Sequence, residues 1–538
     1  MSDAGVLTTM QPHPPAARVP GPSRAQRLAF WRSPDDQPRW ARPALLGIAA
    51  LAAVLYAWNI TGSGYATFYS VAVKSMSVSW KAFWYGALDP GATITIDKLA
   101  GSFLPQALSA RLFGYHQWSL TLPQVIEGVI SVLAMYRLVC RWFGAAAGLL
   151  AAGLFALTPI AASMFGHPME DGALTMCLVL AADAFVRALA QARLRSLVLA
   201  GVWVGLGFQA KMLQAWIVLP ALALTYLMAA PTTWRRRLGH LGVAGAVTVA
   251  VSLSWILLYT ITPANDRPYV DGSTNNNAFS MVFGYNGLDR FGITVPGSVQ
   301  SMFTGGGRAG SGGGPAFGGG TGGAAGAGLF DRQGWTKLLS DGYASQVGWL
   351  YPLALVALVA GLIWYRRAGR ADLARGGFLL WGLWLATFAV VFSRITIPHT
   401  AYMASLAPPL AALSAAGIVL MWRAYRQRRA TWLLPAAIVA ELAWTAYLSS
   451  RFATFLPWLT WLAAGAAALA ALVLLAGAVL RRVPRNVLVP AMALGTAAML
   501  AVPAAWALSV LTPGYGVTAF DASAGRGGRA GGFGPARF

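Results

Sequence analysis

Long apolar runs alternate with short polar connections along most of the chain. Runs of this length can cross about 30 Å of hydrocarbon as helices, and a helix satisfies its own backbone hydrogen bonds where water is absent. The pattern predicts an all-α polytopic membrane protein with about 13 spans, of which the fifth is short. We place them at residues 43–60, 117–139, 144–165, 172–190, 195–210, 212–229, 238–261, 346–365, 377–393, 404–421, 431–450, 455–480 and 487–510.

Arginine-rich connections predict the orientation of these spans. When successive connections are assigned to opposite sides, every cluster of arginines falls on the side of the N-terminus. The short turns on the other side carry Lys211, Arg394 and Arg451 as their basic residues. Because positively charged loops stay in the cytoplasm, we expect an N-inside, C-outside topology. Residues 1–42 then form a basic cytosolic tail, and residues 43–510 form the transmembrane domain.

Composition agrees with a membrane protein and narrows its partners. Of the 538 residues, 57% are hydrophobic and 11% are charged, and the formal net charge is +23. The positive charge is dispersed over helix ends rather than gathered on one soluble face. It therefore favours contact with anionic membrane lipids and argues against a nucleic-acid partner. Cys140 and Cys177 lie at different predicted depths, so we expect no disulfide.

The first outer segment, residues 61–116, is predicted to contain two helices beside the membrane. Its apolar and aromatic residues recur every three or four positions, which is the spacing of one helix face. The opposite face is polar, a pattern typical of a helix that lies in the membrane interface. A second short helix is predicted at 103–113. The stripe comprises Tyr65, Phe68, Tyr69, Ala72, Val73, Met76, Trp80, Phe83 and Trp84.

The second outer segment, residues 262–345, combines polar motifs with a glycine-rich tract. The tract at 305–328 has too little apolar side-chain surface to offset the entropy of ordering, so it is predicted to be a flexible loop. No strand-to-helix context surrounds its glycines, which argues against a nucleotide-binding loop. A second glycine-rich stretch, 511–538, is predicted to be an outer tail.

Acidic residues are scarce, and several are expected on the outer side. Asp89 and Asp97 lie in the first segment, and Glu170 and Asp171 lie between the third and fourth spans. Such a group could deprotonate an acceptor hydroxyl while lysine, arginine or a divalent cation neutralises a departing phosphate. The alternatives are a turn at Asp89 and a solvated pair at Asp97 and Lys98. The spacing of the histidines does not indicate a histidine-bound metal site. A divalent cation at the acids is the one cofactor that the sequence leaves open.

Several stretches of the chain resemble the GT-C membrane glycosyltransferases. More specifically, the chain resembles bacterial members of the protein mannosyltransferase-like family, which are relatives of the lipid-A aminoarabinose transferases. The resemblance covers most of residues 58–415, and its motifs include the Asp97-Lys98 pair, LPQALSARLFG, GFQAKMLQA, RPYVDGSTNNNAFSMVFGYNGLDRFG and HTAYMASLAPPLAAL.

The resemblance implies an inverting transfer of a sugar from a polyprenyl-phosphate donor to a hydroxyl acceptor on a protein, a lipid or a cell-wall glycan. The site is expected on the extracytoplasmic side of a bacterial cytoplasmic membrane. The carboxylates that carry over as catalytic candidates are Asp89, Asp97 and Asp171. The residues that carry over as substrate-binding candidates are Tyr65, Trp80, Lys98, Glu170, Lys211, Arg267, Tyr269, Tyr285, Asn286, Arg290, His399 and Tyr402.

Three departures from the family pattern leave alternatives open. Leu99 and Ala100 stand where relatives have two prolines, the turn before Glu170 lacks an Asn-Arg pair, and the Asp-Glu pair that often follows the first span is missing. A catalytically degenerate binding subunit is therefore one alternative. A transporter of lipid-linked sugars is another, and Glu127 and Glu441 inside predicted spans are the acids available to it.

Overall fold

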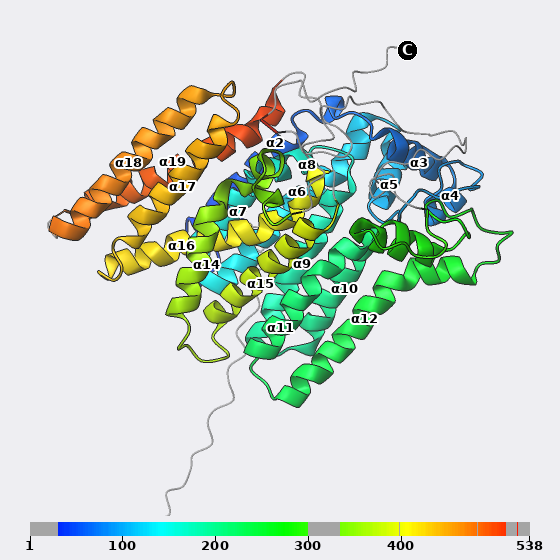
Figure 1. Ribbon diagram of the computed structural model, residues 1–538, viewed down its shortest axis with the longest axis horizontal. Coiled ribbons are helices and arrows are strands. Elements are labelled where there is room, and N and C mark those ends of the chain that lie inside the picture. The colour runs from blue at the N-terminus through cyan, green and yellow to red at the C-terminus, as the bar shows by residue number, and fades with distance from the viewer. Residues whose placement is uncertain (1–30, 300–333, 397–398, 481–482, 513–523, 526–538) are drawn as a thin grey trace, which may run out of the picture.

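The computed structural model describes residues 31–299, 334–396, 399–480, 483–512 and 524–525 (Figure 1). Within these ranges the regular elements are helices, joined by loops that contain isolated bridge pairs. The all-α prediction is therefore confirmed. The glycine-rich tract, most of the basic tail and most of the outer tail lie outside the described residues.

Most of the described chain forms one bundle of roughly parallel helices (Figure 1). Eleven segments in the described ranges are long and apolar enough to cross a membrane, or up to twelve if a bent pair counts as one span. The long helices are α2 (Ala41–Ala57), α6 (Gln117–Phe143), α9 (Glu170–Gln191), α10 (Leu194–Lys211), α11 (Leu219–Ala229), α12 (Trp234–Ile261), α14 (Tyr351–Trp364), α15 (Leu373–Arg394), α16 (Ala407–Arg426), α17 (Leu433–Ser450), α18 (Pro457–Leu480) and α19 (Arg485–Leu508).

The segment from α10 to α11 explains most of the difference from thirteen predicted spans. It is helical throughout and counts as one candidate span of 36 residues, Leu194–Ala229. Met212 nevertheless has a φ of +47° and a ψ of −133°, which turns the chain sharply. Lys211 meets the start of α9, whereas Ala229 lies near Gly376, which also approaches Leu189 near the end of α9. The segment therefore runs along α9 and back again.

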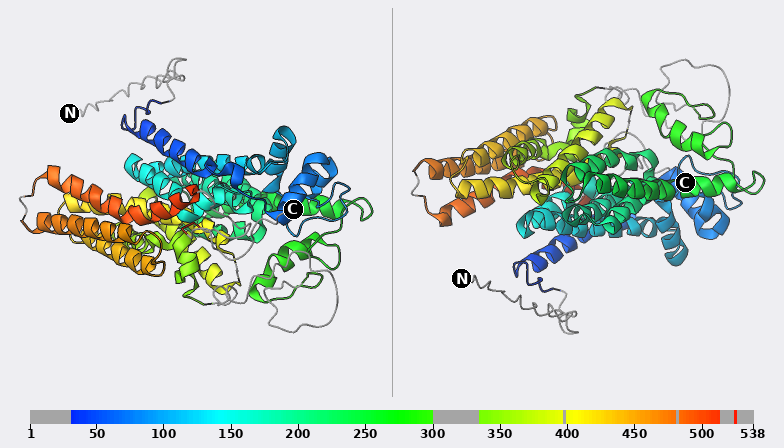
Figure 2. Two further views of the ribbon diagram at one scale, coloured as in Figure 1. Left: turned by 90° about the horizontal axis from the view of Figure 1, so that it is seen from above. Right: turned by 90° about the horizontal axis from the view of Figure 1, so that it is seen from below.

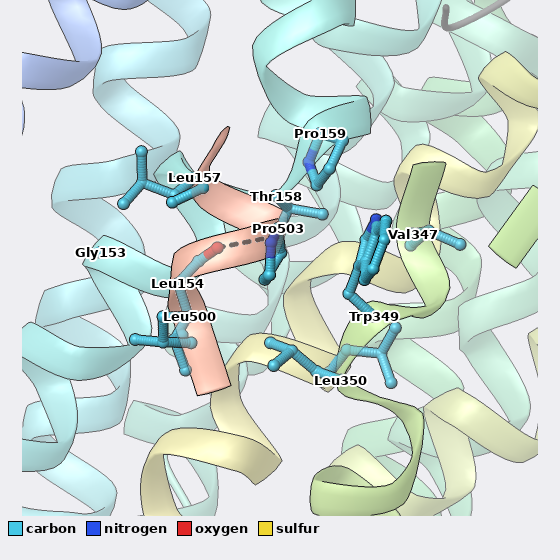
Figure 3. A pocket seen from close by; sticks show the side chains of 12 residues that line it. Gly153, Leu154, Leu157, Thr158, Pro159, Val347, Trp349, Leu350, Leu500 and Pro503 are labelled. Atoms are coloured by element: carbon cyan, nitrogen blue, oxygen red, sulfur yellow. Dashed lines mark hydrogen bonds between the residues drawn. The ribbon is translucent and has the colours of Figure 1, made fainter. Parts of the chain in front are cut away.

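The bent pair consists of α7 (Ala145–Ala156) and α8 (Pro159–Phe165), whose axes differ by 64°. Proline cannot continue the hydrogen bonding of α7, and the Thr158 hydroxyl instead donates to the Leu154 carbonyl at 2.7 Å. A small apolar pocket lies at this break, and Trp349 and Pro503 are among the residues that line it (Figure 3). The break therefore separates two packing surfaces and contains none of the predicted site residues.

Helix α16 is the axis of the bundle, because the most apolar window of its span is completely buried. It packs against α7 on one side and α14 on the other. Glu441 on α17 is also fully buried, and one of its carboxylate oxygens accepts a hydrogen bond of 3.0 Å from the backbone N–H of Leu353 in the first turn of α14. This contact gives Glu441 a structural role.

The first outer segment forms three short helices at one end of the bundle (Figures 1 and 2). These are α3 (Thr67–Val78), α4 (Trp80–Tyr85) and α5 (Phe103–Phe113). The helix predicted at 103–113 is confirmed, whereas the longer predicted helix breaks at Ser79. Ser79 is extended, and its hydroxyl accepts from the backbone N–H of Ala82, as a helix-capping serine does.

The predicted stripe divides between the interior and the surface. Its buried members pack against α5, and they are Tyr69, Ala72, Val73, Met76 and Phe83. The exposed members are Tyr65, Phe68, Trp80 and Trp84. The stripe is predicted as one helix face, but the break at Ser79 places Trp80 and Trp84 on a separate helix, α4, while Tyr65 and Phe68 lie exposed before the break.

Gly101 brings the first outer segment into direct contact with α10. Its N–H donates to the Gln209 carbonyl at 3.1 Å, and a Cβ at this position would lie 2.4 Å from that carbonyl oxygen. The Ser102 hydroxyl donates to the Ala210 carbonyl at 2.8 Å. Both contacts use carbonyls in the last turn of α10, where no intrahelical donor is available.

We expect Gly101→Ala to destabilise the protein by about 1–3 kcal/mol, because the added methyl group must displace backbone atoms. The measurement is the midpoint of thermal unfolding in detergent. Gly245→Ala on α12 is the matched control, since no atom lies within 4 Å of its Cβ position. Equal midpoints for the two variants would contradict the close packing at Gly101.

Candidate active site

Two buried acids and two buried lysines form an ion-pair cluster where the first outer segment meets α9 and α10. We call Lys98, Glu170, Asp171 and Lys211 the acid–lysine cluster. The Nζ of Lys98 lies 2.9 Å from Glu170, and the Nζ of Lys211 lies 2.6 Å from Asp171 and 3.5 Å from Glu170. All four side chains are at most 10% exposed. Their charges balance, which a buried cluster requires.

Helix geometry explains how residues so far apart in sequence meet. Glu170 and Asp171 form the first turn of α9, and Lys211 is the last residue of α10, which packs along α9. Acids are favoured at helix N-termini and lysines at C-termini, so both placements agree with the helix dipoles. Lys98 precedes Gly101, whose contact with α10 holds the loop in place.

Asp97 lies beside this cluster between two tyrosines. The Tyr69 hydroxyl donates to one carboxylate oxygen and the Tyr285 hydroxyl to the other, each at 3.4 Å. The Asn286 side chain donates to the Asp97 carbonyl at 2.6 Å. Burial and the Asp97 charge raise the pKa of Tyr285 to about 12, so its phenol stays protonated and can donate. Asp97 is half-buried, and no lysine pairs with its carboxylate among the described residues.

Aromatic rings form the walls around the cations. Lys98 lies 4.3 Å from the centre of the Tyr69 ring, and Lys211 lies 4.0 Å from that of Tyr402. Arg290 lies 5.8 Å from the Tyr285 ring. Cation–π attraction of this kind stabilises a lysine without neutralising it.

The two outer segments are joined by backbone hydrogen bonds next to the site. Ile94 and Tyr269 form a parallel bridge, in which the Thr95 N–H donates to the Tyr269 carbonyl at 2.8 Å. The Tyr269 N–H donates to the Thr93 carbonyl at the same distance. Tyr269 therefore contributes through its backbone, and its hydroxyl donates to the Ser273 carbonyl.

Several predicted site residues lie outside this arrangement. The Asp89 carboxylate accepts from the backbone and the hydroxyl of Thr93 at 2.9 and 2.7 Å, in a tight turn. Slight burial acts to raise the pKa of Asp89, but these hydrogen bonds lower it below its ordinary value. The structure does not bring Asp89 into the cluster, because its carboxylate accepts hydrogen bonds from Thr93 within the same turn.

Three further candidates are held by neighbours of their own. Tyr65 stacks on the Tyr115 ring at 5.2 Å between centroids, and Trp80 lies under the Arg111 guanidinium at 3.8 Å. Arg267 lies 4.2 Å from the Tyr259 ring and donates to the Asn276 carbonyl at 3.3 Å. His399 reaches the site indirectly, through a ring contact of 6.3 Å with Tyr402.

Tyr69 and Gln214 also contact the site, although they are not among the residues predicted for it. Tyr69 belongs to the predicted apolar stripe, and its hydroxyl is the signal that it can also serve a polar partner. The Gln214 amide donates to the Tyr402 carbonyl at 3.1 Å and to the Ser405 hydroxyl at 3.0 Å. It lies three residues after Lys211 in the GFQAKMLQA motif, which was a usable signal.

Within the described ranges, no group of three or more His, Cys, Asp or Glu residues is placed to hold a metal ion. The carboxylates of Glu170 and Asp171 are instead bound to lysines.

Comparison with known proteins identifies the family. The family model of dolichyl-phosphate-mannose-protein mannosyltransferases matches residues 101–255. YycA of Bacillus subtilis, described as a mannosyltransferase, is 32% identical over 470 residues, which cover 76% of this chain and 68% of YycA. The chain belongs to the dolichyl-phosphate-mannose-protein mannosyltransferase family. Its members are glycosyltransferases, and the chain is accordingly a membrane glycosyltransferase.

Two further curated proteins are similar to this chain. YkcB of Bacillus subtilis, also described as a mannosyltransferase, is 32% identical over 71% of this chain and 62% of its own length. An undecaprenyl phosphate-alpha-4-amino-4-deoxy-L-arabinose arabinosyl transferase of Pseudomonas paraeruginosa is 31% identical over 28% of both chains. The chain thus spans roughly two thirds of the two Bacillus relatives.

Solved structures agree on the fold. The crystal structure of ArnT from Cupriavidus metallidurans bound to undecaprenyl phosphate superimposes with a TM-score of 0.53 at 17% identity. The superposition covers 87% of this chain and 76% of ArnT. The GT-C fold expected from the sequence is therefore confirmed.

The family departures at Leu99 and Ala100 affect packing. Leu99 belongs to the main core and Ala100 to the core between α3 and α5. Ala100 lies against Gly86, where a Cβ would come within 2.5 Å of the alanine methyl group. In this mannosyltransferase-family member both residues are buried in apolar cores next to Lys98 in sequence.

Replacing Lys98 by methionine tests the cluster as a structural element. Burial acts to lower the pKa of Lys98, but Glu170 and its other neighbours raise it well above the ordinary value of 10.5. We expect Lys98→Met to lower the free energy of unfolding by about 3 kcal/mol near pH 7, because Glu170 loses its nearest cation. The measurement is chemical or thermal unfolding in detergent.

The loss should decrease above pH 10.5, the ordinary value of the lysine pKa. There the unfolded lysine has already lost its proton while the folded one retains it, so the folded ion pair stabilises the protein less as the pH rises. Adding Glu170→Gln to Lys98→Met should recover part of the loss. An unfolding free energy that is unchanged in Lys98→Met would contradict the buried pair.

Proposed function

We propose that the protein transfers a sugar, with inversion, from a polyprenyl-phosphate donor to a hydroxyl acceptor on the extracytoplasmic face of a bacterial cytoplasmic membrane. The observation that carries this proposal is a half-buried carboxylate, Asp97, beside two buried lysines that are fixed by acids. A base next to fixed cations suits a reaction in which an acceptor loses a proton while a phosphate leaves.

The chemical step uses Asp97 as general base. The acceptor oxygen attacks the anomeric carbon from the face opposite the phosphate, and the bond between that carbon and the phosphate oxygen breaks. The acceptor proton passes to the Asp97 carboxylate, and the electron pair of the broken bond remains on the polyprenyl phosphate. The products are the glycosylated acceptor and a polyprenyl monophosphate.

Asp97 fits the base better than Asp171 for a physical reason. Both Asp171 oxygens lie 2.6 Å from the Lys211 ammonium in a fully buried position, so that carboxylate is already neutralised. The Asp97 oxygens receive two long hydrogen bonds of 3.4 Å from neutral phenols. A buried carboxylate whose two oxygens are both held by an ammonium must break that ion pair before it can accept a proton, whereas Asp97 has no such ion pair to break within the described part of the chain.

The leaving phosphate needs cations, and Lys98 and Arg290 are the candidates we favour. Lys98 donates to one carboxylate oxygen of Glu170 at 2.9 Å and, as an ammonium, has further donors. Burial acts to lower the pKa of Arg290, but Tyr402, Tyr285 and Asp97 raise it, so the guanidinium remains charged. Lys211 is more fully engaged, and in this proposal it mainly holds Asp171 and Glu170 in place.

Several observations support the donor class and the membrane side. Undecaprenyl phosphate appears in the names of the arabinosyl transferase relative and of the ArnT complex. A lipid carrier also suits a site outside the cytoplasm, where nucleotide sugars are not supplied. The distribution of arginine clusters favours placing the start of α9 on that side. The sugar and the acceptor are left open in this proposal.

The decisive comparison is between Asp97→Asn and Asp89→Asn. We expect Asp97→Asn to reduce sugar transfer from a polyprenyl-phosphate donor by roughly a hundredfold or more, which is the usual effect of losing a general base. Asp89→Asn should retain activity within a few fold, because Asp89 closes a turn. The measurement is transfer of radiolabelled sugar by purified protein, together with the unfolding midpoint of each variant.

Binding of the donor should survive in Asp97→Asn, since the cations are unchanged. Donor retention with lost transfer would support Asp97 as base. Undiminished transfer in Asp97→Asn, or an equal loss in both variants at unchanged midpoints, would overturn the assignment. Donor binding without transfer in the wild-type protein, tested with acceptors of all three classes, would instead support a binding subunit.

A further inference from the structure

Three arginines converge on one buried aspartate at the opposite end of α6 and α9 from the acid–lysine cluster. Asp183 is at most 1% exposed. Arg137 reaches it with two nitrogens at 3.1 and 2.7 Å, Arg141 with one at 2.6 Å and Arg187 with one at 2.9 Å. We call these four residues the Asp183 cluster.

The Asp183 cluster is not neutral. Counted over these four residues, one carboxylate balances one of the three guanidinium groups, which leaves a formal charge of +2. Asp36 is a further carboxylate near Cys140 and Tyr136 on the same helix, but it forms no ion pair with these arginines among the described residues. The contacts occupy both carboxylate oxygens, whereas each guanidinium uses one or two of its N–H groups. In the described part of the chain, the remaining donors are available to an anion. The arginine side chains are 48%, 39% and 32% exposed, so an anion can reach them.

The cluster lies near the ends of two candidate membrane helices, where lipid headgroups are expected. Arg141 and Arg137 lie two and six residues before the end of α6 at Phe143, and Arg187 lies four residues before the end of α9 at Gln191. At about 1.5 Å per residue, all three are within about 9 Å of the helix ends. A free cytosolic anion would meet such residues less readily than a lipid phosphate held at the same level.

We propose that the Asp183 cluster is a binding site for the phosphate of an anionic phospholipid, in the leaflet opposite the acid–lysine cluster. Asp183 acts as a positioning residue, since it fixes three guanidinium groups that would otherwise repel one another. Planar guanidinium groups bind phosphate oxygens through paired hydrogen bonds, so a fixed group of them favours a phosphate over a diffuse negative charge. The site is distinct from the proposed donor site and does not depend on sugar transfer.

The experiment measures how far a lipid raises the unfolding midpoint of the full-length protein in detergent. The probes are a phosphatidylglycerol, a phosphatidylcholine of the same chain length, and inorganic phosphate. The test variant is Arg137→Gln with Arg141→Gln, which leaves the Arg187 ion pair to Asp183. The matched control is Arg235→Gln with Arg236→Gln, which removes the same charge from exposed positions in the first turn of α12.

We expect phosphatidylglycerol to raise the midpoint of the wild-type protein and of the control, while phosphatidylcholine and phosphate do not. In the test variant the lipid dissociation constant should increase roughly tenfold or more, which follows from the loss of two cations near a lipid phosphate. Each variant is compared with its own lipid-free midpoint, so a loss of basal stability does not obscure the result.

Asp183→Asn separates positioning from simple charge. It raises the formal charge of the cluster, so general attraction predicts tighter lipid binding, whereas loss of positioning predicts weaker binding. Weaker binding supports the proposal. Tighter binding, equal losses in the test and control variants, or equal stabilisation by inorganic phosphate would overturn it.

Discussion

The buried ion pairs between α9 and its two lysine partners are the constraint on which the rest of this protein depends. Charges removed from water destabilise a fold unless each finds a partner with good geometry. The pairs of Lys98 with Glu170 and of Lys211 with Asp171 therefore dictate where the first outer segment and the end of α10 must lie. The packing of α3, α5 and α10 supplies that placement, with Gly101 as the point of closest approach.

The sequence predicted the elements well where one kind of signal acted alone. The length of the apolar runs identified the membrane helices. The short helix α5 was predicted with its observed ends at Phe103 and Phe113. It failed to predict the break at Ser79, where a capping serine interrupts an otherwise continuous stripe. The sequence did predict a turn at Lys211 between spans 195–210 and 212–229, and the chain reverses there, but the positive φ of Met212 was not predicted.

The site was predictable in part for a similar reason. The scarcity of acids in an apolar chain singled out Glu170 and Asp171, whereas Lys98 and Lys211 were indicated by the family resemblance. The roles of Asp89 and Asp97 could not be separated, because both are loop acids next to residues that form turns. The distinction lies in Tyr69 and Tyr285, which reach Asp97 from 28 and 188 residues away in sequence. Contacts between residues so far apart in the chain leave no local sequence pattern.

The turn at Met212 has a consequence for how tightly the site tolerates change. Its positive φ is a conformation that costs a residue with a side chain about 1–3 kcal/mol, and it adjoins Lys211 directly. An insertion or deletion within the last turns of α10 would shift Lys211 along the helix axis by about 1.5 Å for each residue. An ammonium held 2.6 Å from both oxygens of Asp171 has no slack for such a shift. Changes in the length of α10 next to this turn should therefore be tolerated less well than changes in the length of the outer segments.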